Sequence, residues 1–144
     1  MDEATPAEAR ARAQWRYLNA AEQLGIYAPT EMLARLRSLP EVAQEWPEVA
    51  YKVAVHTAQI TEVDGALTVG SPREGYRAAV RAAEVAERAV RDPAHPHDPY
   101  GLLWRPHYIA AACARAFGDP IVARRSARAG LAAGGPAEVF AEFL

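Results

Sequence analysis

Residues 106–133 read PHYIAAACARAFGDPIVARRSARAGLAA, and this stretch decides the fold class. Two alanine-rich segments flank the dipeptide Gly118-Asp119. Glycine commonly follows the last residue of a helix, and aspartate ahead of a proline is typical of the cap of the next helix. Such a short connection predicts that helices over about 106–117 and 120–133 pack as an antiparallel αα-hairpin. The sequence therefore predicts an all-α fold.

Proline marks further helix starts, because its missing N–H costs nothing at the first helical position. Thr5-Pro6-Ala7-Glu8 and Ser71-Pro72-Arg73-Glu74 are capping boxes, in which a hydroxyl accepts a hydrogen bond from the amide three residues on. Residues with helical apolar spacing follow both starts. We expect about six helices packed as an irregular array, at 6–24, 30–39, 47–63, 72–91, 106–117 and 120–133, and a short last helix could follow at 136–144.

The stretch 47–69 is compatible with two structures. Apolar residues at spacings of three and four predict a helix that ends at Asp64-Gly65, and these residues are Val49, Val53, Thr57, Ile60 and Val63. The same stretch is rich in β-branched residues, and Asp64-Gly65 lies between ITEV and ALTV. That arrangement indicates a small β-hairpin over about 59–69.

Composition restricts the class of protein. The 144 residues fit one helical domain over 1–144, and much of the 51% hydrophobic fraction is alanine, which predicts thin, closely packed helices. Cys113 is the only cysteine, so the chain has neither an internal disulfide nor a Cys/His quartet for a closed zinc site. The acidic start MDEATPAEAR does not resemble a leader, and no segment approaches a membrane span. We expect a cytoplasmic protein that needs no membrane and no cofactor.

Charge is uneven along the chain although its sum is only −2. Residues 1–72 carry a net −4, residues 73–128 a net +4, and the remainder −2. Oppositely charged halves make a homo-oligomer conceivable. An arginine-rich face could bind phosphates, and its candidate residues are Arg77, Arg81, Arg88, Arg124, Arg125 and Arg128. Solvated arginine on alanine-rich helices is the alternative interpretation.

Residues 115–131, RAFGDPIVARRSARAGL, contain a Gly-Asp turn, the small Ala123 where the second helix crosses the first, and Leu131 on the packing face. Over about 102–136 this pattern resembles a tetratricopeptide repeat. It departs from the repeat where alanine replaces larger or other residues, at Ala110, Ala111 and Ala114. The resemblance implies a repeat-like helical scaffold that binds peptides or partner helices on a concave face. The alternative is an ordinary close-packed αα-hairpin.

The same segment is also similar to a DNA-reading helix-turn-helix. The residues that match its first helix and turn are Ala114, Phe117 and Gly118. The arginines of 124–128 would project from the second helix, but Asp119 and Arg124 stand where that motif normally has hydrophobic residues. The carboxylate of Asp119 would also repel phosphates. A nucleic-acid-binding regulator is therefore the alternative function.

Histidine gives the only indication of catalytic chemistry. Three histidines lie close in the sequence, and these weak metal-ligand candidates are His95, His97 and His107. Imidazole binds metals near neutral pH, so with Asp98 they predict an open metal site of a hydrolase or nuclease. Surface histidines in a proline-rich loop are the alternative, and His56 is expected to be a partly buried helix residue.

Motifs for nucleophilic catalysis are absent from the sequence, which has no Gly-x-Ser-x-Gly, phosphate loop or Gly-x-Gly-x-x-Gly. Cys113 in AAACA is expected to be an inert core thiol. Trp15, Trp46 and Trp104 are expected to anchor the core, and Trp104 alternatively lines a groove or an interface. These features favour a non-enzymatic protein–protein interaction module, which means a helical scaffold, adaptor or regulatory subunit with a protein partner.

Overall fold

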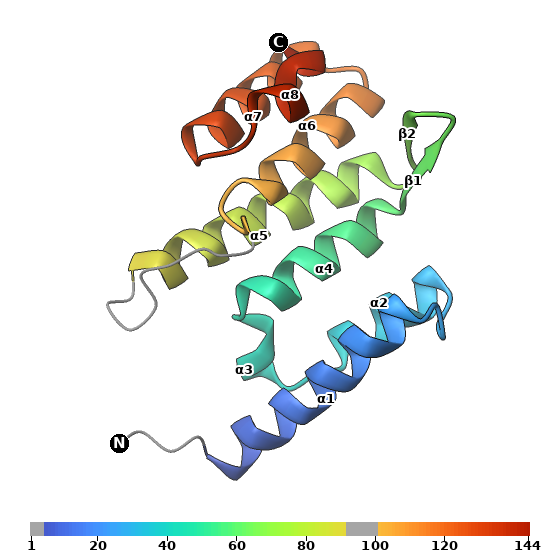
Figure 1. Cartoon of the computed structure of the whole chain (residues 1–144), viewed down its shortest axis with the longest axis vertical. Helices are drawn as coiled ribbons and strands as arrows, with labels where there is room; N and C mark the ends of the chain where they lie inside the picture. Colours follow the sequence, from blue (N-terminus) through green and yellow to red (C-terminus); the bar gives the residue numbers. More distant parts are fainter. Residues whose placement is uncertain (1–4, 92–100) are drawn as a thin grey trace.

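The computed structural model describes residues 5–91 and 101–144, and within them the chain is mainly helical (Figure 1). A short 3₁₀ helix, η1 (Ala141–Phe143), follows the last α-helix, and the only sheet in this part of the chain has two strands, β1 (Ile60–Val63) and β2 (Ala66–Val69). The described α-helices are α1 (Pro6–Gln23), α2 (Pro29–Arg37), α3 (Glu41–Gln44), α4 (Pro47–Ala58), α5 (Pro72–Arg91), α6 (Arg105–Ala116), α7 (Pro120–Ala132) and α8 (Ala137–Phe140). The predicted all-α class is confirmed.

Helix caps explain why these helices begin where they do. Thr5 Oγ1 accepts a hydrogen bond from the amide of Glu8 at 3.1 Å, and Asp119 Oδ1 accepts one from the amide of Val122 at 3.0 Å. Proline occupies the first turn of α1, α2, α4, α6 and α7. The six long helices begin close to their predicted first residues, whereas the four-residue α3 was not predicted.

Residues 59–69 form the β-hairpin, so the second of the two structures predicted for this stretch is confirmed and a helix reaching residue 63 is wrong. Helix α4 ends at Ala58, because Gln59 takes a left-handed backbone conformation with φ of 51°. The two strands pair antiparallel, with Ile60 opposite Val69. The turn at Asp64-Gly65 has φ values of 52° and 78°, and positive values at both positions are what a two-residue type I′ turn requires. The hairpin carries the chain from the end of α4 back to the start of α5.

The long helices form three successive antiparallel pairs, α1 with α2, α4 with α5 and α6 with α7 (Figure 1). The second helix of one pair packs against the first helix of the next, so α2 contacts α4 and α5 contacts α6, and α4 also contacts α6. In Figure 1 the first helices α1, α4 and α6 run in the same direction. None of the described helices is both long and apolar enough to cross a lipid bilayer.

The interior contains two kinds of packing. Large side chains, among them Trp15, Met32 and Leu36, join α1 and α2 to α3 and the start of α4. Alanine fills most of the cluster between α4, α5 and α6, where Cys113 is fully buried. Burial raises the pKa of the Cys113 thiol to about 11, so the thiol stays protonated at neutral pH. The expectation of a core thiol at this position is confirmed.

The surroundings of Gly75 show how closely the alanine-lined helices α4, α5 and α6 approach one another. A Cβ atom at Gly75 would lie 2.6 Å from Ala58 Cβ, 2.7 Å from Ala58 Cα and 2.9 Å from Cys113 Sγ. Helix α5 therefore begins in contact with the backbone of α4 and with a side chain of α6. Only glycine leaves room for these three helices to pack together at this position.

Candidate functional site

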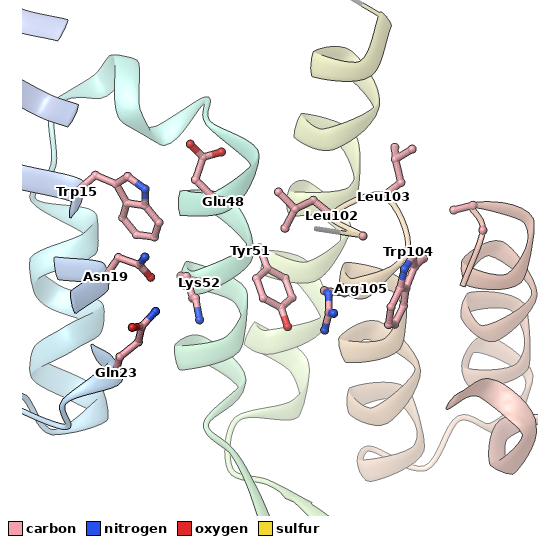
Figure 2. A pocket seen from close by; sticks show the side chains of 13 residues that line it. Trp15, Asn19, Gln23, Glu48, Tyr51, Lys52, Leu102, Leu103, Trp104 and Arg105 are labelled. Atoms are coloured by element: carbon pink, nitrogen blue, oxygen red, sulfur yellow. The ribbon is translucent and has the colours of Figure 1, made fainter. Parts of the chain in front are cut away.

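A groove of about 1100 Å³ lies between α1, α4 and the turn that leads into α6, and we call it the α1–α4–α6 groove. Figure 2 shows side chains of α1 on one side, Tyr51 and Lys52 of α4 in the middle, and residues 102–105 on the other side. Ala133 and Gly134, after α7, complete the lining. The first helix of each of the three pairs therefore contributes residues to the lining of the groove.

Helix α1 contributes three side chains, Trp15, Asn19 and Gln23, which are spaced by four residues and so lie one turn apart on one face. Trp15 is only 9% exposed and anchors this wall in the core. The carboxamides of Asn19 and Gln23 point into the groove (Figure 2) and make no hydrogen bond to another residue within 5–91 and 101–144. Each carboxamide therefore offers both donors and an acceptor to a ligand.

The charged side chains on the α4 side of the groove are paired with residues of α1. Glu48 Oε1 accepts a hydrogen bond from Arg12 Nη1 at 2.9 Å, and Lys52 Nζ donates to Glu22 Oε1 at 2.6 Å. The Arg12 guanidinium also lies 3.6 Å from the ring centroid of the partly buried Trp46. These contacts join α1 to α4, and they leave little uncompensated charge on this part of the lining.

Glu22 is the centre of a polar cluster at one end of this contact. Its second oxygen, Oε2, lies 3.2 Å from Nε2 of His56, which is partly buried on α4 as expected. Burial raises the pKa of Glu22, but hydrogen bonds from His56 and Lys52 and the attraction of their charges outweigh burial, so the net pKa is lowered. The ionised carboxylate therefore stabilises the contact between α1 and α4.

The wall opposite α1 depends on Gly101 and Trp104. Gly101 has φ of 67°, a backbone conformation that favours glycine. A Cβ atom at this position would also collide with the Trp104 indole, so there is no space for a side chain. The indole meets Phe140 edge to face, with ring centroids 6.0 Å apart, and the Arg105 guanidinium lies 4.8 Å from the indole centroid. Trp104 is thus fixed on one side and faces the groove on the other, as the second interpretation of this residue anticipated.

The sequence-predicted arginines fall into two sets. Arg81 and Arg88 on α5 share the carboxylate of Glu45, at 2.9 Å and 3.1 Å, while Arg77 has no ion pair in the described part of the chain. The other set is exposed on α7 and consists of Arg124, Arg125 and Arg128. Helix α6 contacts both α5 and α7 and lies between them in Figure 1. The arginines therefore do not form one continuous face.

The predicted histidine cluster falls mostly outside the described residues. His95 and His97 lie in the segment 92–100, so the structure says nothing of them. His107 is half-buried on α6, where burial lowers its pKa while the charge of Glu87 acts to raise it. Within residues 5–91 and 101–144, no group of three His, Cys, Asp or Glu side chains is placed to hold a metal ion.

Several groove residues were not singled out from the sequence, namely Asn19, Gln23, Tyr51 and Lys52. The four-residue spacing from Trp15 to Gln23 is the only signal that places some of them on one face. What the groove offers a ligand is a row of carboxamides, two aromatic surfaces and mostly compensated charge. No family model, curated protein or solved structure matches this chain.

Proposed function

We propose that this protein is a non-enzymatic interaction module that holds an extended segment of a partner protein in the α1–α4–α6 groove. An extended segment exposes one N–H and one C=O group per residue. Asn19 and Gln23 can donate to and accept from such groups whatever the side chains of the partner are. These two uncommitted carboxamides, one helical turn apart on a single groove wall, are the observation that carries the proposal.

The aromatic side chains of the groove support the same function. Tyr51 projects from α4 between the two walls, and Trp104 forms part of the far wall (Figure 2). Flat aromatic surfaces bury partner side chains at a low cost in conformational entropy, and they dominate many protein interfaces. The volume of about 1100 Å³ also exceeds the range of about 300–1000 Å³ that is typical for small-molecule sites. A chain segment suits this space better than a small metabolite.

Electrostatics at the groove favour a peptide over a nucleic acid. The Glu48 carboxylate is paired with Arg12, and the Lys52 ammonium is paired with Glu22. A nucleic-acid site needs an excess of positive charge that can neutralise several phosphates. The groove therefore selects its ligand by hydrogen bonding and shape more than by net charge.

The arrangement of helices supports a second part of the proposal, which concerns the resemblance to tetratricopeptide repeats. Each of three successive helical pairs contributes its first helix, or the turn that leads into it, to the same groove. Repeat proteins use shared surfaces of this kind as extended binding faces. We therefore propose that the three pairs act as a short repeat-like scaffold with the groove as its concave face.

Selection of peptides by phage display on the full chain tests the proposed function. Enriched peptides are then titrated by fluorescence polarisation against wild type and the variants Gln23→Ala and Tyr51→Ala. Gln14→Ala is the matched control, because Gln14 is an exposed carboxamide on another face of α1. We expect about a tenfold loss of affinity in Gln23→Ala and in Tyr51→Ala, because each removes a contact of about 1–2 kcal/mol, and no change in Gln14→Ala.

Two results would contradict the proposal. The first is a library without enriched peptides, and the second is a set of enriched peptides that bind Gln23→Ala and Tyr51→Ala as tightly as wild type. Binding of nucleic acid that falls steeply with salt, and that is lost when Arg124, Arg125 and Arg128 are replaced by alanine, would favour the alternative function of a nucleic-acid-binding regulator.

A further inference from the structure

A second hollow, of about 530 Å³, lies on the other side of α4 from the α1–α4–α6 groove. Its floor is made by Ala50, Val53 and Thr57, whereas the groove is lined by other residues of α4, namely Glu48, Tyr51 and Lys52. Successive residues of a helix are rotated by about 100°, so these two sets lie on opposite faces of α4. The two hollows are therefore separate sites that share one helix.

Three arginine side chains contribute to the lining of this second hollow, which we call the arginine pocket. Arg37 comes from the end of α2, while Arg77 and Arg81 lie one turn apart on α5. Glu74 is the one acidic residue in the lining, so arginines outnumber carboxylates there by three to one. This lining favours an anionic ligand.

The guanidinium groups of the pocket differ in their contacts. Arg81 is paired with Glu45 at 2.9 Å, outside the lining. In the described residues, neither Arg37 nor Arg77 has a carboxylate within ion-pair distance. Two of the three guanidinium groups are thus available to a ligand, and each can present a fork of N–H donors to two oxygens.

Arg37 is oriented by a buried hydroxyl. The Thr57 side chain is only 4% exposed, and its Oγ1 donates to the carbonyl oxygen of Val53 at 2.6 Å. The same Oγ1 accepts a hydrogen bond from Arg37 Nη2 at 3.4 Å. Thr57 therefore holds the guanidinium of Arg37 toward the pocket before any ligand binds, which lowers the entropy cost of binding.

We propose that the arginine pocket binds a phosphomonoester group, either as free phosphate or as the phosphate of a small phosphorylated compound. A phosphomonoester carries close to two negative charges at neutral pH and has three acceptor oxygens, which fits the two guanidinium groups, those of Arg37 and Arg77, that have no carboxylate partner in the described residues. The volume of about 530 Å³ leaves space for a small group beyond the phosphate.

Isothermal titration calorimetry on the full chain tests this site. Inorganic phosphate and O-phosphoserine are titrated separately at constant ionic strength, and an oligothymidylate serves as the phosphodiester probe. We expect saturable binding of the monoesters with Kd of about 0.1 mM or tighter. If O-phosphoserine binds more tightly than inorganic phosphate, the ligand is a small phosphorylated compound. If the two bind equally, the ligand is free phosphate. Either result supports the site.

Charge variants locate the binding in the pocket. Arg37→Gln and Arg77→Gln should each weaken binding of the monoester about tenfold or more. Arg77→Lys keeps the positive charge but loses the forked pair of N–H donors, so its affinity should lie between those of wild type and Arg77→Gln. Arg124→Gln on α7 removes the same charge from a distant exposed position and should leave the affinity unchanged. All of these side chains are exposed, so the variants are expected to fold, and circular dichroism checks this.

Three results would overturn the proposal. They are the absence of saturable binding at about millimolar monoester, an equal loss of affinity in Arg124→Gln and Arg77→Gln, and binding of the oligothymidylate without binding of either monoester. The arginine pocket shares no lining residue with the α1–α4–α6 groove, so this test and the peptide test can fail independently.

Discussion

Helices α1–α3 are held together mainly by large side chains, whereas helices α4–α6 are held together mainly by small ones. The first region joins its helices with large side chains such as Trp15 and Leu36, and with polar contacts from α1 to α4. The second region brings its helices together with alanine and with Gly75. Large side chains stabilise a helix pair by burying much apolar surface per residue. Small side chains stabilise it by letting the helices approach closely, so that their backbones and neighbouring side chains pack against one another. The comparison teaches that the first region should be sensitive to loss of side-chain volume and the second to added volume.

Removal of a large side chain from the first region should lower the free energy of unfolding more than any other change considered below. Leu36 is fully buried between α1, α2 and α4, so Leu36→Ala is expected to lower the free energy of unfolding by about 4 kcal/mol, from lost burial and a remaining cavity. Urea denaturation measures this change. Leu24→Ala is the control, because Leu24 is 75% exposed and its truncation should cost less than about 0.5 kcal/mol. A cost below about 1 kcal/mol for Leu36→Ala would show that this region does not depend on its large side chains.

Addition of a single methyl group to the second region should have the next largest effect. Helix propensity alone predicts that Gly75→Ala stabilises α5 by about 1 kcal/mol. The new Cβ would instead meet Ala58 and Cys113 at less than 3 Å, so we expect a net loss of about 3 kcal/mol in urea denaturation. Ala13→Leu adds more atoms on an exposed face of α1 and should be nearly neutral. A stabilised Gly75→Ala protein would refute the close approach of α4 and α5.

Neutralisation of Glu22 should weaken the polar contact between α1 and α4 by about 2 kcal/mol at neutral pH. Because the folded state lowers the pKa of Glu22, the stabilisation is present above its ordinary value of 4.5 and is lost as the pH falls through the lowered value. The difference between wild type and Glu22→Gln in urea denaturation should therefore shrink toward zero in acid. Glu31→Gln is the control, because its ion pair with Arg35 is half-exposed and worth little. A difference that does not depend on pH would contradict the role of the charge.

Loss of Arg12 should have the smallest effect. Its ion pair with Glu48 is partly exposed, and its guanidinium covers the Trp46 ring, so Arg12→Ala is expected to cost about 0.5–1 kcal/mol. Hydrogen exchange should localise the change to amides of α1, because Arg12 ties only this helix to α4. Exchange that rises equally in α5 and α6 would mean that the two regions unfold as one unit.

Much of the fold could be predicted from the sequence because its signals are local. Thr5 and Asp119 cap their helices as predicted, and the Gly118-Asp119 turn joins α6 to α7. The sequence left the end of α4 undecided between a helix to 63 and a hairpin over 59–69, because Gln59 adopts a left-handed conformation without glycine and the helical apolar spacing continues past it. In the structure, Ile60 and Val69 of the hairpin pack against the cluster between α4, α5 and α6, a long-range contact that local sequence patterns do not reveal.

The two hollows could not be predicted, because neither corresponds to a motif. The α1–α4–α6 groove combines residues from around positions 20, 50 and 104, whose proximity follows from the order in which the helices stack. The arginine pocket includes Arg77 and Arg81, which were singled out for their charge, but it also needs Arg37 from the acidic half of the chain. Charge counted along the sequence therefore does not identify which arginines meet in space.

The exposed turn of the β-hairpin has a practical consequence for labelling experiments. Asp64 and Gly65 are exposed, and the hairpin lies at the end of α4 and α5 rather than between helices (Figure 1). Loop tips of this kind tolerate inserted segments. A short epitope or a fluorophore attachment site placed between these two residues would report on the protein without occupying either hollow, since neither is lined by residues of the hairpin.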